Sequence, residues 1–341
     1  MRAEDPWRRL AGRILSAACF VGVMLAGALV EAAPRSRPDP PGTATEVRVG
    51  MFVIDVASID DASQTYKADI LATVRWRDPR LAFVAAPGGD DVRVFPLTEV
   101  WQPDLLVVNR REATRAYPDQ VRVAPDGTVL YRQRFLFTLA SPLELRQFPF
   151  DRQTLWIRVA SLYGSDEVTL VPEAGDTGRR PQFSLAGWSV ALGEMTADTV
   201  ERTAGERLPR LSLSLTATRD TRYYFWKLFV PLGLIVFMAW TVFFLDHAQL
   251  GPRIGVSTAS IFSLIAFQLS LGRVLPPISY LTRADQFVLG CSVLVFLALA
   301  ETILTSKLNA AGRQELSRRI DRIARPAYAL LFLVVAAITL S

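Results

Sequence analysis

The chain has 341 residues, of which half are apolar, and a formal net charge of +5. The length exceeds one ordinary domain and the apolar share is high for a soluble protein, so two or more units are expected. The single histidine, His247, excludes most metal sites and histidine-based catalysis, and both cysteines lie in apolar runs, so no disulfide is expected elsewhere. The basic residues are dispersed or lie beside apolar segments, which indicates membrane orientation and argues against nucleic-acid binding.

Residues 1–33 have the pattern of a secretory signal sequence. A basic start with Arg8, Arg9 and Arg13 is followed by the apolar stretch 14–30 and by small residues suited to cleavage. An uncleaved first membrane helix is the alternative interpretation. The proline-rich residues 34–46 are expected to be a flexible lead-in.

Residues 47–219 are predicted to form an all-β domain. Short runs of alternating apolar and polar residues predict strands at 47–56, 65–76, 128–139, 153–161 and 210–219. Turn-forming residues such as Asp60-Asp61 and Pro125-Asp126-Gly127 separate these runs. Many short strands of this kind are typical of an immunoglobulin-like β-sandwich.

Four apolar segments follow within residues 220–341. We expect helices at about 223–245, 253–275, 284–307 and 322–340, each close to the length that crosses a hydrocarbon core of roughly 30 Å. The link between the last two segments is rich in basic residues: Lys307, Arg313, Arg318, Arg319, Arg322 and Arg325. Because such residues favour the cytoplasm, we predict a multi-pass protein of the inner (plasma) membrane with its β domain in the periplasm or extracellular space.

The second segment, 253–275, is long enough to span a membrane and yet polar. No charge lies between Arg253 and Arg273, but six side chains interrupt the apolar run: Ser257, Thr258, Ser260, Ser263, Gln268 and Ser270. Polar residues inside membranes usually face a bundle interior or a water-filled path. The helix is therefore either buried among its neighbours, with hydroxyls bonded to its own carbonyls, or it lines a pore with an arginine ring near each mouth.

Five motifs occur in order across both domains. They are Trp76–Leu81 (WRDPRL), 101–104 (WQPD), 148–153 (FPFDRQ), Arg219 twelve residues before Pro231, and 275–285 (LPPISYLTRAD). Together they resemble the pentameric ligand-gated ion channels, in the bacterial branch that lacks the loop disulfide. The resemblance covers nearly the whole mature chain and implies a β-sandwich, a four-helix transmembrane bundle and a homopentamer around a central pore.

The resemblance also implies a coupling interface where the two domains join. Its residues are Asp61, Phe148, Pro149, Phe150, Asp151 and Arg219. An apolar aromatic turn needs a partner surface, and the membrane domain is the nearest one. Two carboxylates around one guanidinium make a plausible charge network, while three separately solvated charges are the alternative.

Along the pore helix the resemblance implies a lumen-facing stripe. Its members are Arg253, Gly255, Ala259, Phe262, Ala266, Leu269 and Arg273. A phenylalanine ring can gate by dewetting, and arginine rings favour anions; the GPRIG sequence before the helix also resembles the glycine- and GABA-receptor type. We therefore expect an anion-selective pore. A cation-selective or weakly selective pore is the alternative if Arg253 points away from the lumen or Asp246 lies near the mouth.

Agonists of the family bind between neighbouring subunits, beneath a hairpin that corresponds here to residues 196–208. That hairpin has no aromatic residue, so a cage for a quaternary ammonium ligand is not expected. Candidate ligand contacts are Arg75, Arg77, Trp101 and Tyr163, of which the arginines suit a carboxylate and the aromatic residues are equally suited to structural roles. Gln64 replaces the glutamate of proton-gated bacterial members, which disfavours proton gating. The agonist is expected to be a small molecule of unknown identity.

The sequence contains no nucleophile elbow, zinc-protease motif, phosphate-binding loop or spaced cysteine set. We expect no enzymatic activity, no cofactor, no bound metal and no nucleic-acid partner. The expected partners are the other subunits, an agonist, permeant inorganic ions and the lipid bilayer. A non-conducting, membrane-anchored periplasmic sensor remains the alternative of another class, although the short cytoplasmic linker leaves little to signal with.

Overall fold

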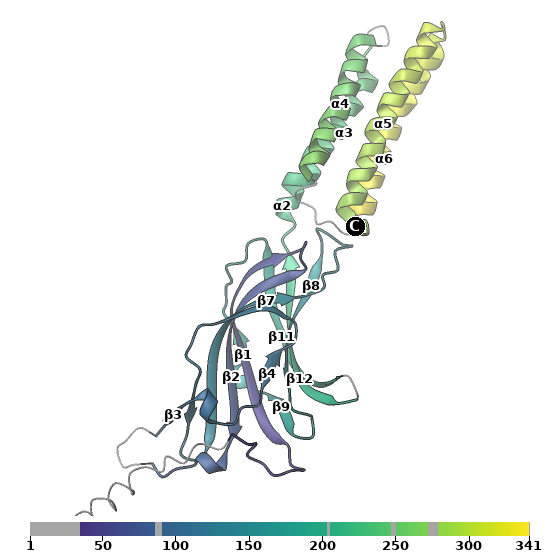
Figure 1. Cartoon of the computed structure of the whole chain (residues 1–341). Coiled ribbons are helices and arrows are strands. Elements are labelled where there is room, and N and C mark those ends of the chain that lie inside the picture. The colour runs from purple at the N-terminus through teal and green to yellow at the C-terminus, as the bar shows by residue number, and fades with distance from the viewer. Residues whose placement is uncertain (1–34, 86–90, 203–204, 247–249, 272–278, 341) are drawn as a thin grey trace, which may run out of the picture.

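A computed structural model describes residues 35–85, 91–202, 205–246, 250–271 and 279–340. A β domain and a bundle of long helices lie end to end (Figure 1). The predicted signal sequence, residues 1–33, and the first residue of the lead-in lie outside the described residues.

The β domain consists of two sheets. The larger has the order β10-β1-β2-β7-β6-β3, with β5 paired to β7 and β9 paired to β1. Its strands are β1 (Thr45–Asp60), β2 (Thr65–Arg77), β3 (Arg93–Pro96), β5 (Arg110–Arg115), β6 (Gln120–Val123), β7 (Thr128–Ala140), β9 (Val168–Pro172) and β10 (Gly178–Arg179). The smaller sheet has the order β11-β12-β8-β4. Its strands are β4 (Leu105–Val107), β8 (Arg152–Ser161), β11 (Trp188–Glu201) and β12 (Arg207–Arg219).

The core of the β domain follows from alternation along the strands. In β1 the alternate residues Val47, Val49, Met51 and Val53 are buried, because successive side chains of a strand point to opposite faces. They belong to the same hydrophobic core as the alternate leucines of β12 in the other sheet. The predicted β-sandwich is confirmed.

The WRDPRL motif forms a structural corner. The buried Asp78 side chain accepts hydrogen bonds from Arg80 N at 3.1 Å and Arg80 Nε at 2.9 Å, at the start of a short 3₁₀ turn, Pro79–Leu81. The Asp78 amide donates to the Gly127 carbonyl at 2.9 Å. Gly127 has a φ of 82°, and a Cβ there would lie 2.5 Å from the Asp78 carbonyl oxygen, so this turn requires glycine.

Among the described residues, four helical segments are long and apolar enough to cross a membrane. The first runs without a break through α2 (Arg222–Tyr224), a π-helical turn (Phe225–Phe229), α3 (Val230–Thr241) and a 3₁₀ turn (Val242–Phe244). The others are α4 (Leu250–Leu271), α5 (Arg283–Ala310) and α6 (Gln314–Leu340). The expected four-helix domain is therefore present, and α6 begins earlier than expected, inside the basic linker.

One end of the helix bundle lies at the junction with the β domain, and the other end lies far from it. The start of α4 and the turn from α5 to α6 lie far from the β domain, whereas the C-terminal end of α6 returns to the junction (Figure 1). At the junction α5 begins with a capping box, in which Thr282 and Asp285 satisfy each other's backbone amides. Farther along, a Cβ on Gly290 would lie 2.6 Å from Val335 Cγ1, so glycine permits α5 and α6 to pack closely.

Candidate functional site

A charge network lies where the β domain meets the helices. Arg219, the last residue of β12, donates from Nε to Asp151 Oδ1 at 2.7 Å and from Nη2 to Asp61 Oδ1 at 2.8 Å. The side chains of Arg219 and Asp151 are 3% and 1% exposed, and that of Asp61 is 18% exposed. Burial alone would lower the pKa of Arg219, but the hydrogen bonds to Asp151 and Asp61 outweigh it and raise the pKa above its ordinary value.

Aromatic rings enclose the same guanidinium. Its carbon lies 4.1 Å from the centre of the Trp188 ring and 4.7 Å from that of Phe148, and Phe148 in turn packs edge-on against Tyr224. Trp188 was not among the predicted site residues. The signal that identifies it is register, because Trp188 at the start of β11 lies directly opposite Arg219 in the hairpin.

The FPF turn is fastened to the membrane domain. The Leu145 amide donates to the Tyr280 hydroxyl at 3.0 Å, and the Ala284 amide at the start of α5 donates to the Phe148 carbonyl at 3.2 Å. Pro149 is buried, and Phe150 stacks on Phe229 of the first membrane segment at 6.0 Å between ring centres. The turn therefore contacts both the first and the third membrane segments, so any displacement of the turn acts on both.

The exposed face of α4 carries most of the residues expected in the lumen. These are Gly255, Ala259, Phe262, Ala266 and Leu269. The side chains of Phe262 and Leu269 are 66% and 74% exposed. These five residues are exposed in one protomer, and that they face a lumen stays a prediction. Arg273 lies outside the described residues.

Two hydroxyl residues of α4, Ser257 and Ser260, are buried on the opposite, inward face. Ser257 lies 3.4 Å from the Thr302 hydroxyl of α5, and Ser260 donates to the Val256 carbonyl of its own helix at 2.9 Å. Nearer the junction, Gln268 donates to Ser292 at 2.8 Å. These side chains hydrogen-bond within the bundle of one protomer, so their polarity does not mark a water-filled path.

Arg253 requires a correction. It was expected at the inner mouth of the pore, but its side chain is 1% exposed within a single protomer and lies between helices. Its Nη2 atom is 3.1 Å from Asp321 Oδ1 of α6 and 3.5 Å from Glu301 Oε2 of α5. Burying a guanidinium is tolerated only with such partners, and neither carboxylate was anticipated from the sequence. A lumen-facing arginine ring at this position is therefore wrong for this structure.

Of the four candidate ligand contacts, Trp101 is also corrected. It is 2% exposed, packs edge-on against Trp76, and donates from Nε1 to the Tyr163 hydroxyl at 3.2 Å. A ring enclosed in the core of its own protomer cannot touch a ligand bound between subunits, so Trp101 instead supports Tyr163 from behind.

Arg75 and Arg77 differ in how well each is placed to bind an external anion. Arg75 Nη1 lies 2.7 Å from Asp176 and 3.6 Å from Glu173, near the 3₁₀ turn Ala174–Asp176. Its charge is thus shared with carboxylates of its own chain. Arg77 is exposed and is the better placed of the two to receive an external anion.

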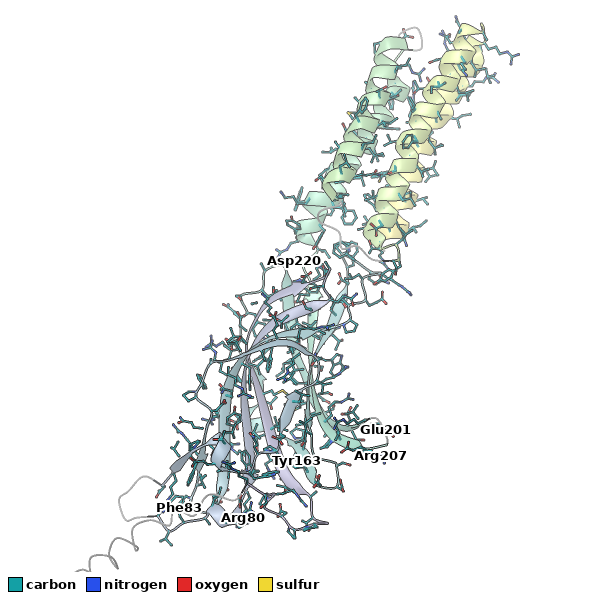
Figure 2. The ribbon with its side chains drawn as sticks, viewed as in Figure 1. Arg80, Phe83, Tyr163, Glu201, Arg207 and Asp220 are labelled. Carbon is teal, nitrogen blue, oxygen red and sulfur yellow. The ribbon has the colours of Figure 1, made fainter. Side chains whose placement is uncertain are left out.

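Tyr163 lies close to the β11–β12 hairpin. Figure 2 shows Glu201 and Arg207 at the free end of the hairpin, with Tyr163 on the side toward the sandwich. The Ser165 amide, two residues after Tyr163, donates to the Arg207 carbonyl at 2.8 Å. Arg210 pairs with Asp198 across the hairpin and, by this hydrogen bond, lowers the pKa of Asp198. The hairpin and the Tyr163 loop therefore form one connected surface.

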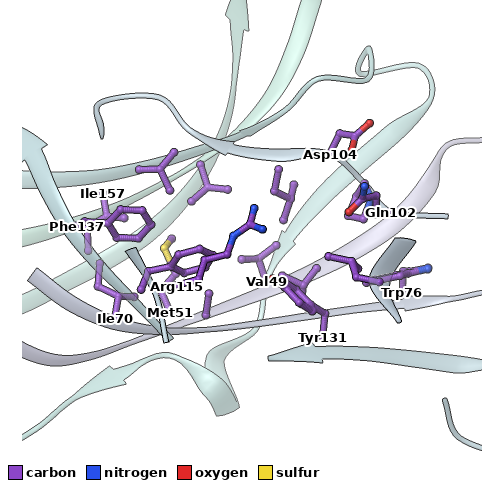
Figure 3. A pocket seen from close by; sticks show the side chains of 18 residues that line it. Val49, Met51, Ile70, Trp76, Gln102, Asp104, Arg115, Tyr131, Phe137 and Ile157 are labelled. Atoms are coloured by element: carbon purple, nitrogen blue, oxygen red, sulfur yellow. The ribbon is translucent and has the colours of Figure 1, made fainter. Parts of the chain in front are cut away.

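A separate cavity of about 120 Å³ lies inside the sandwich. Figure 3 shows the apolar side chains of Met51, Ile70 and Phe137 gathered at one end and Gln102 and Asp104 at the other. Its lining comes from both sheets of the β domain, with Met51 and Ile70 from the larger sheet and Ile157 from the smaller one.

Comparisons with known proteins agree with this geometry. A family model described as the neurotransmitter-gated ion-channel ligand binding domain matches residues 26–220, and one described as the transmembrane region of the same channels matches residues 228–325. A proton-gated ion channel of Gloeobacter violaceus is 28% identical over 300 residues, which is 86% of this chain and 83% of that protein. The chain is a multi-pass membrane protein with an extracellular N-terminal domain, not an enzyme, and it belongs to the neurotransmitter-gated ion-channel family, the pentameric ligand-gated channels.

Proposed function

We propose that five copies of this chain form a homopentameric channel, opened by a small ligand that binds between neighbouring β domains. One exposed, uncharged stripe on α4 cannot enclose water by itself, so several copies around an axis are needed. Identical surfaces arranged by rotation also create the subunit interfaces at which the ligand binds. A stable monomer in mild detergent, seen by native mass measurement, would contradict the assembly.

The observation that carries the proposal is the junction. Arg219 is fixed between two carboxylates and two aromatic rings, and the FPF turn beside it is hydrogen-bonded to the start of α5. A membrane-anchored sensor that conducts nothing has no need for this rigid connection to the bundle. A channel needs one, because ligand binding in the β domain must change the packing of the pore helices.

Residues on two faces are proposed for ligand recognition. Tyr163, held by Trp101 and adjacent to the hairpin, supports one face of the interface. Exposed Arg77 of the neighbouring subunit supplies a positive charge to the other, which favours a ligand with a carboxylate. We therefore propose a small carboxylate as the agonist, which distinguishes this chain from the relative described as proton-gated.

We propose that the pore prefers anions weakly. The only charged residue of the sequence between Gly251 and Leu271 is Arg253, and it is buried. The exposed face of that stretch thus supplies no acidic ring to collect cations. Any preference for anions rests on Arg273, whereas exposed Asp246 before α4 acts in the opposite direction.

Flux assays on purified protein in liposomes test these points together. Small carboxylates and, separately, acidic buffer are applied, and chloride and potassium fluxes are recorded. We expect carboxylate-evoked flux that Arg77→Ala weakens, with a reversal potential that follows chloride and that Arg273→Gln moves toward zero. Activation by acid alone would contradict the carboxylate proposal, and a reversal potential that follows potassium would contradict the anion preference.

A further inference from the structure

Three charged side chains lie together inside the bundle, at the end far from the β domain. Arg253 comes from α4, Glu301 from α5 and Asp321 from α6, and their side chains are 1%, 13% and 1% exposed. The Arg253 Nη2 atom hydrogen-bonds Asp321 at 3.1 Å and lies 3.5 Å from Glu301. We name this group the inner cluster.

A polar seam continues from the inner cluster. One turn along α4, Ser257 meets Thr302, the residue after Glu301. On the other side, Ser317 of α6, one turn before Asp321, donates to the Thr305 carbonyl of α5 at 3.2 Å. These polar contacts join the three helices and fix the rotation of each helix about its axis. Apolar packing alone would not fix that rotation.

The cluster resists rotation of α4 in a specific direction. If the helix turned to bring Arg253 toward the exposed stripe of Gly255 and Ala259, Glu301 and Asp321 would remain buried together without their guanidinium. A buried charge that loses its partner is strongly destabilised. The favourable setting is the observed one, in which the charge stays inside and small, uncharged residues face outward.

Asp321 links α6 directly to α4. The helix α6 packs chiefly against α5. The hydrogen bond from Arg253 of α4 to Asp321 of α6 joins these two helices. Glu301 of α5 lies next to the same guanidinium. Elsewhere α6 is also held to the first membrane segment, where Arg325 Nε donates to the Phe243 carbonyl at 2.9 Å.

We propose that Arg253 and Asp321 are positioning residues that set the rotation of the inner half of the pore helix, with Glu301 as the second anchor. This rests on the proposed function in one respect, that the exposed stripe of α4 faces the lumen. The permeating ion meets Gly255 and Ala259 because Asp321, on the far side of the bundle, holds Arg253 away from them.

Cysteine accessibility tests the proposal without an agonist. Ala259→Cys reports the lumen stripe, Ser257→Cys reports the inward face, and the native Cys291, which is fully buried in α5, reports general loosening of the bundle. The full-length pentamer in detergent is treated with a charged thiol reagent, and modification is located by peptide mass spectrometry. Each reporter is combined with Asp321→Asn and, as a matched control, with Arg322→Gln at the exposed neighbouring position of α6.

We expect Ala259→Cys to react and Ser257→Cys to stay unmodified in otherwise wild-type protein. With Asp321→Asn, the rate at which Ser257→Cys is modified rises at least about tenfold. A tenfold change corresponds to a loss of about 1.4 kcal/mol in the free energy that favours the buried orientation. Cys291 remains unmodified, and Arg322→Gln has no effect. The exchange of Arg253→Glu with Asp321→Arg, which keeps one guanidinium and two carboxylates, restores protection of Ser257→Cys.

The results that overturn the proposal are distinct from those that overturn the proposed function. If Ala259→Cys is inert in otherwise wild-type protein, the lumen assignment fails, and the inference fails with it. If Ala259→Cys reacts but Ser257→Cys stays protected with Asp321→Asn, only the positioning role is refuted. If Cys291 becomes reactive together with Ser257→Cys, Asp321 serves general stability, which also contradicts the positioning role. Glu301→Gln provides a second variant should Asp321→Asn not assemble.

Discussion

Replacing Arg219 by glutamine should uncouple the β domain from the pore. The change removes a charge that is 3% exposed and leaves Asp151 and Asp61 facing each other across the junction. Removing one partner of a buried ion pair costs about 3–5 kcal/mol. Because Asp151 is almost fully buried and would also lose the stacked guanidinium beside it, we expect the upper part of that range for Arg219→Gln.

The neighbouring residues predict an order of effects. Asp151→Asn should cost nearly as much as Arg219→Gln, because its partner is equally buried. Asp61 is 18% exposed and accepts a single bond of 2.8 Å from Arg219, so Asp61→Asn should cost less, about 1–3 kcal/mol. Arg222→Gln is the matched control, since that side chain is 86% exposed and pairs only with Asp220 among the described contacts.

Two measurements on the same preparations check this order. Thermal unfolding of the pentamer is followed by tryptophan fluorescence, for which Trp188, 4.1 Å from the Arg219 guanidinium, is a local reporter. Flux into liposomes is then evoked by the ligand that opens the wild type. We expect Arg219→Gln to assemble, to unfold at lower temperature and to respond weakly. Equal unfolding temperatures and equal responses for Arg219→Gln and Arg222→Gln would refute the reasoning.

Three further predictions concern the fold. Leu213→Ala, at a fully buried position in the centre of β12, should destabilise the β domain by about 2–5 kcal/mol, and an unchanged unfolding temperature would contradict its core position. Gly290→Leu should force α5 and α6 apart and cost about 1–3 kcal/mol through overpacking, while Gly233→Ala, whose Cβ would find its nearest atom at 3.8 Å, should be tolerated in the same thermal assay. Desolvation raises the pKa of Asp104 in the folded protein above its ordinary value. Ionisation of this carboxyl therefore lowers the stability of the folded state as the pH rises from below the ordinary pKa through the folded-state pKa. The backbone of Asp104 has a φ of 43°, a conformation that asparagine accepts well. Asp104→Asn should therefore raise the unfolding temperature at about pH 7, and by a smaller amount at about pH 3, where the carboxyl is protonated in both states; an equal gain at both pH values would contradict the ionisation argument.

The fold was largely accessible from the sequence, because its signals are local. Alternation along 47–56 and 210–219 predicts strands that pack as one core, and the apolar lengths predict the membrane segments. The start of α6 was placed too late because the basic linker lowers hydropathy without preventing helix formation. The linker continues the helix, and its residue Ser317 packs against α5.

The site was accessible only in part, because a sequence does not show which side of a helix or strand faces a partner. Asp61, Asp151 and Arg219 meet as the family resemblance implies. Arg253 does not face outward, because Glu301 and Asp321, far away in the chain, hold it inside the bundle. No local pattern connects these three residues, so only the packing of α4, α5 and α6 shows that they meet.

Single-channel recording of Phe262→Ala tests the central claim, that the exposed stripe of α4 encloses a gated ion path, most directly and without an agonist. The Phe262 ring is 66% exposed in one protomer, and five such rings would form an apolar constriction that excludes water. In planar bilayers we predict frequent unitary currents from purified pentamers of Phe262→Ala and very few from wild-type pentamers without ligand. Pentamers of Phe262→Ala that are as silent as the wild type would contradict the claim.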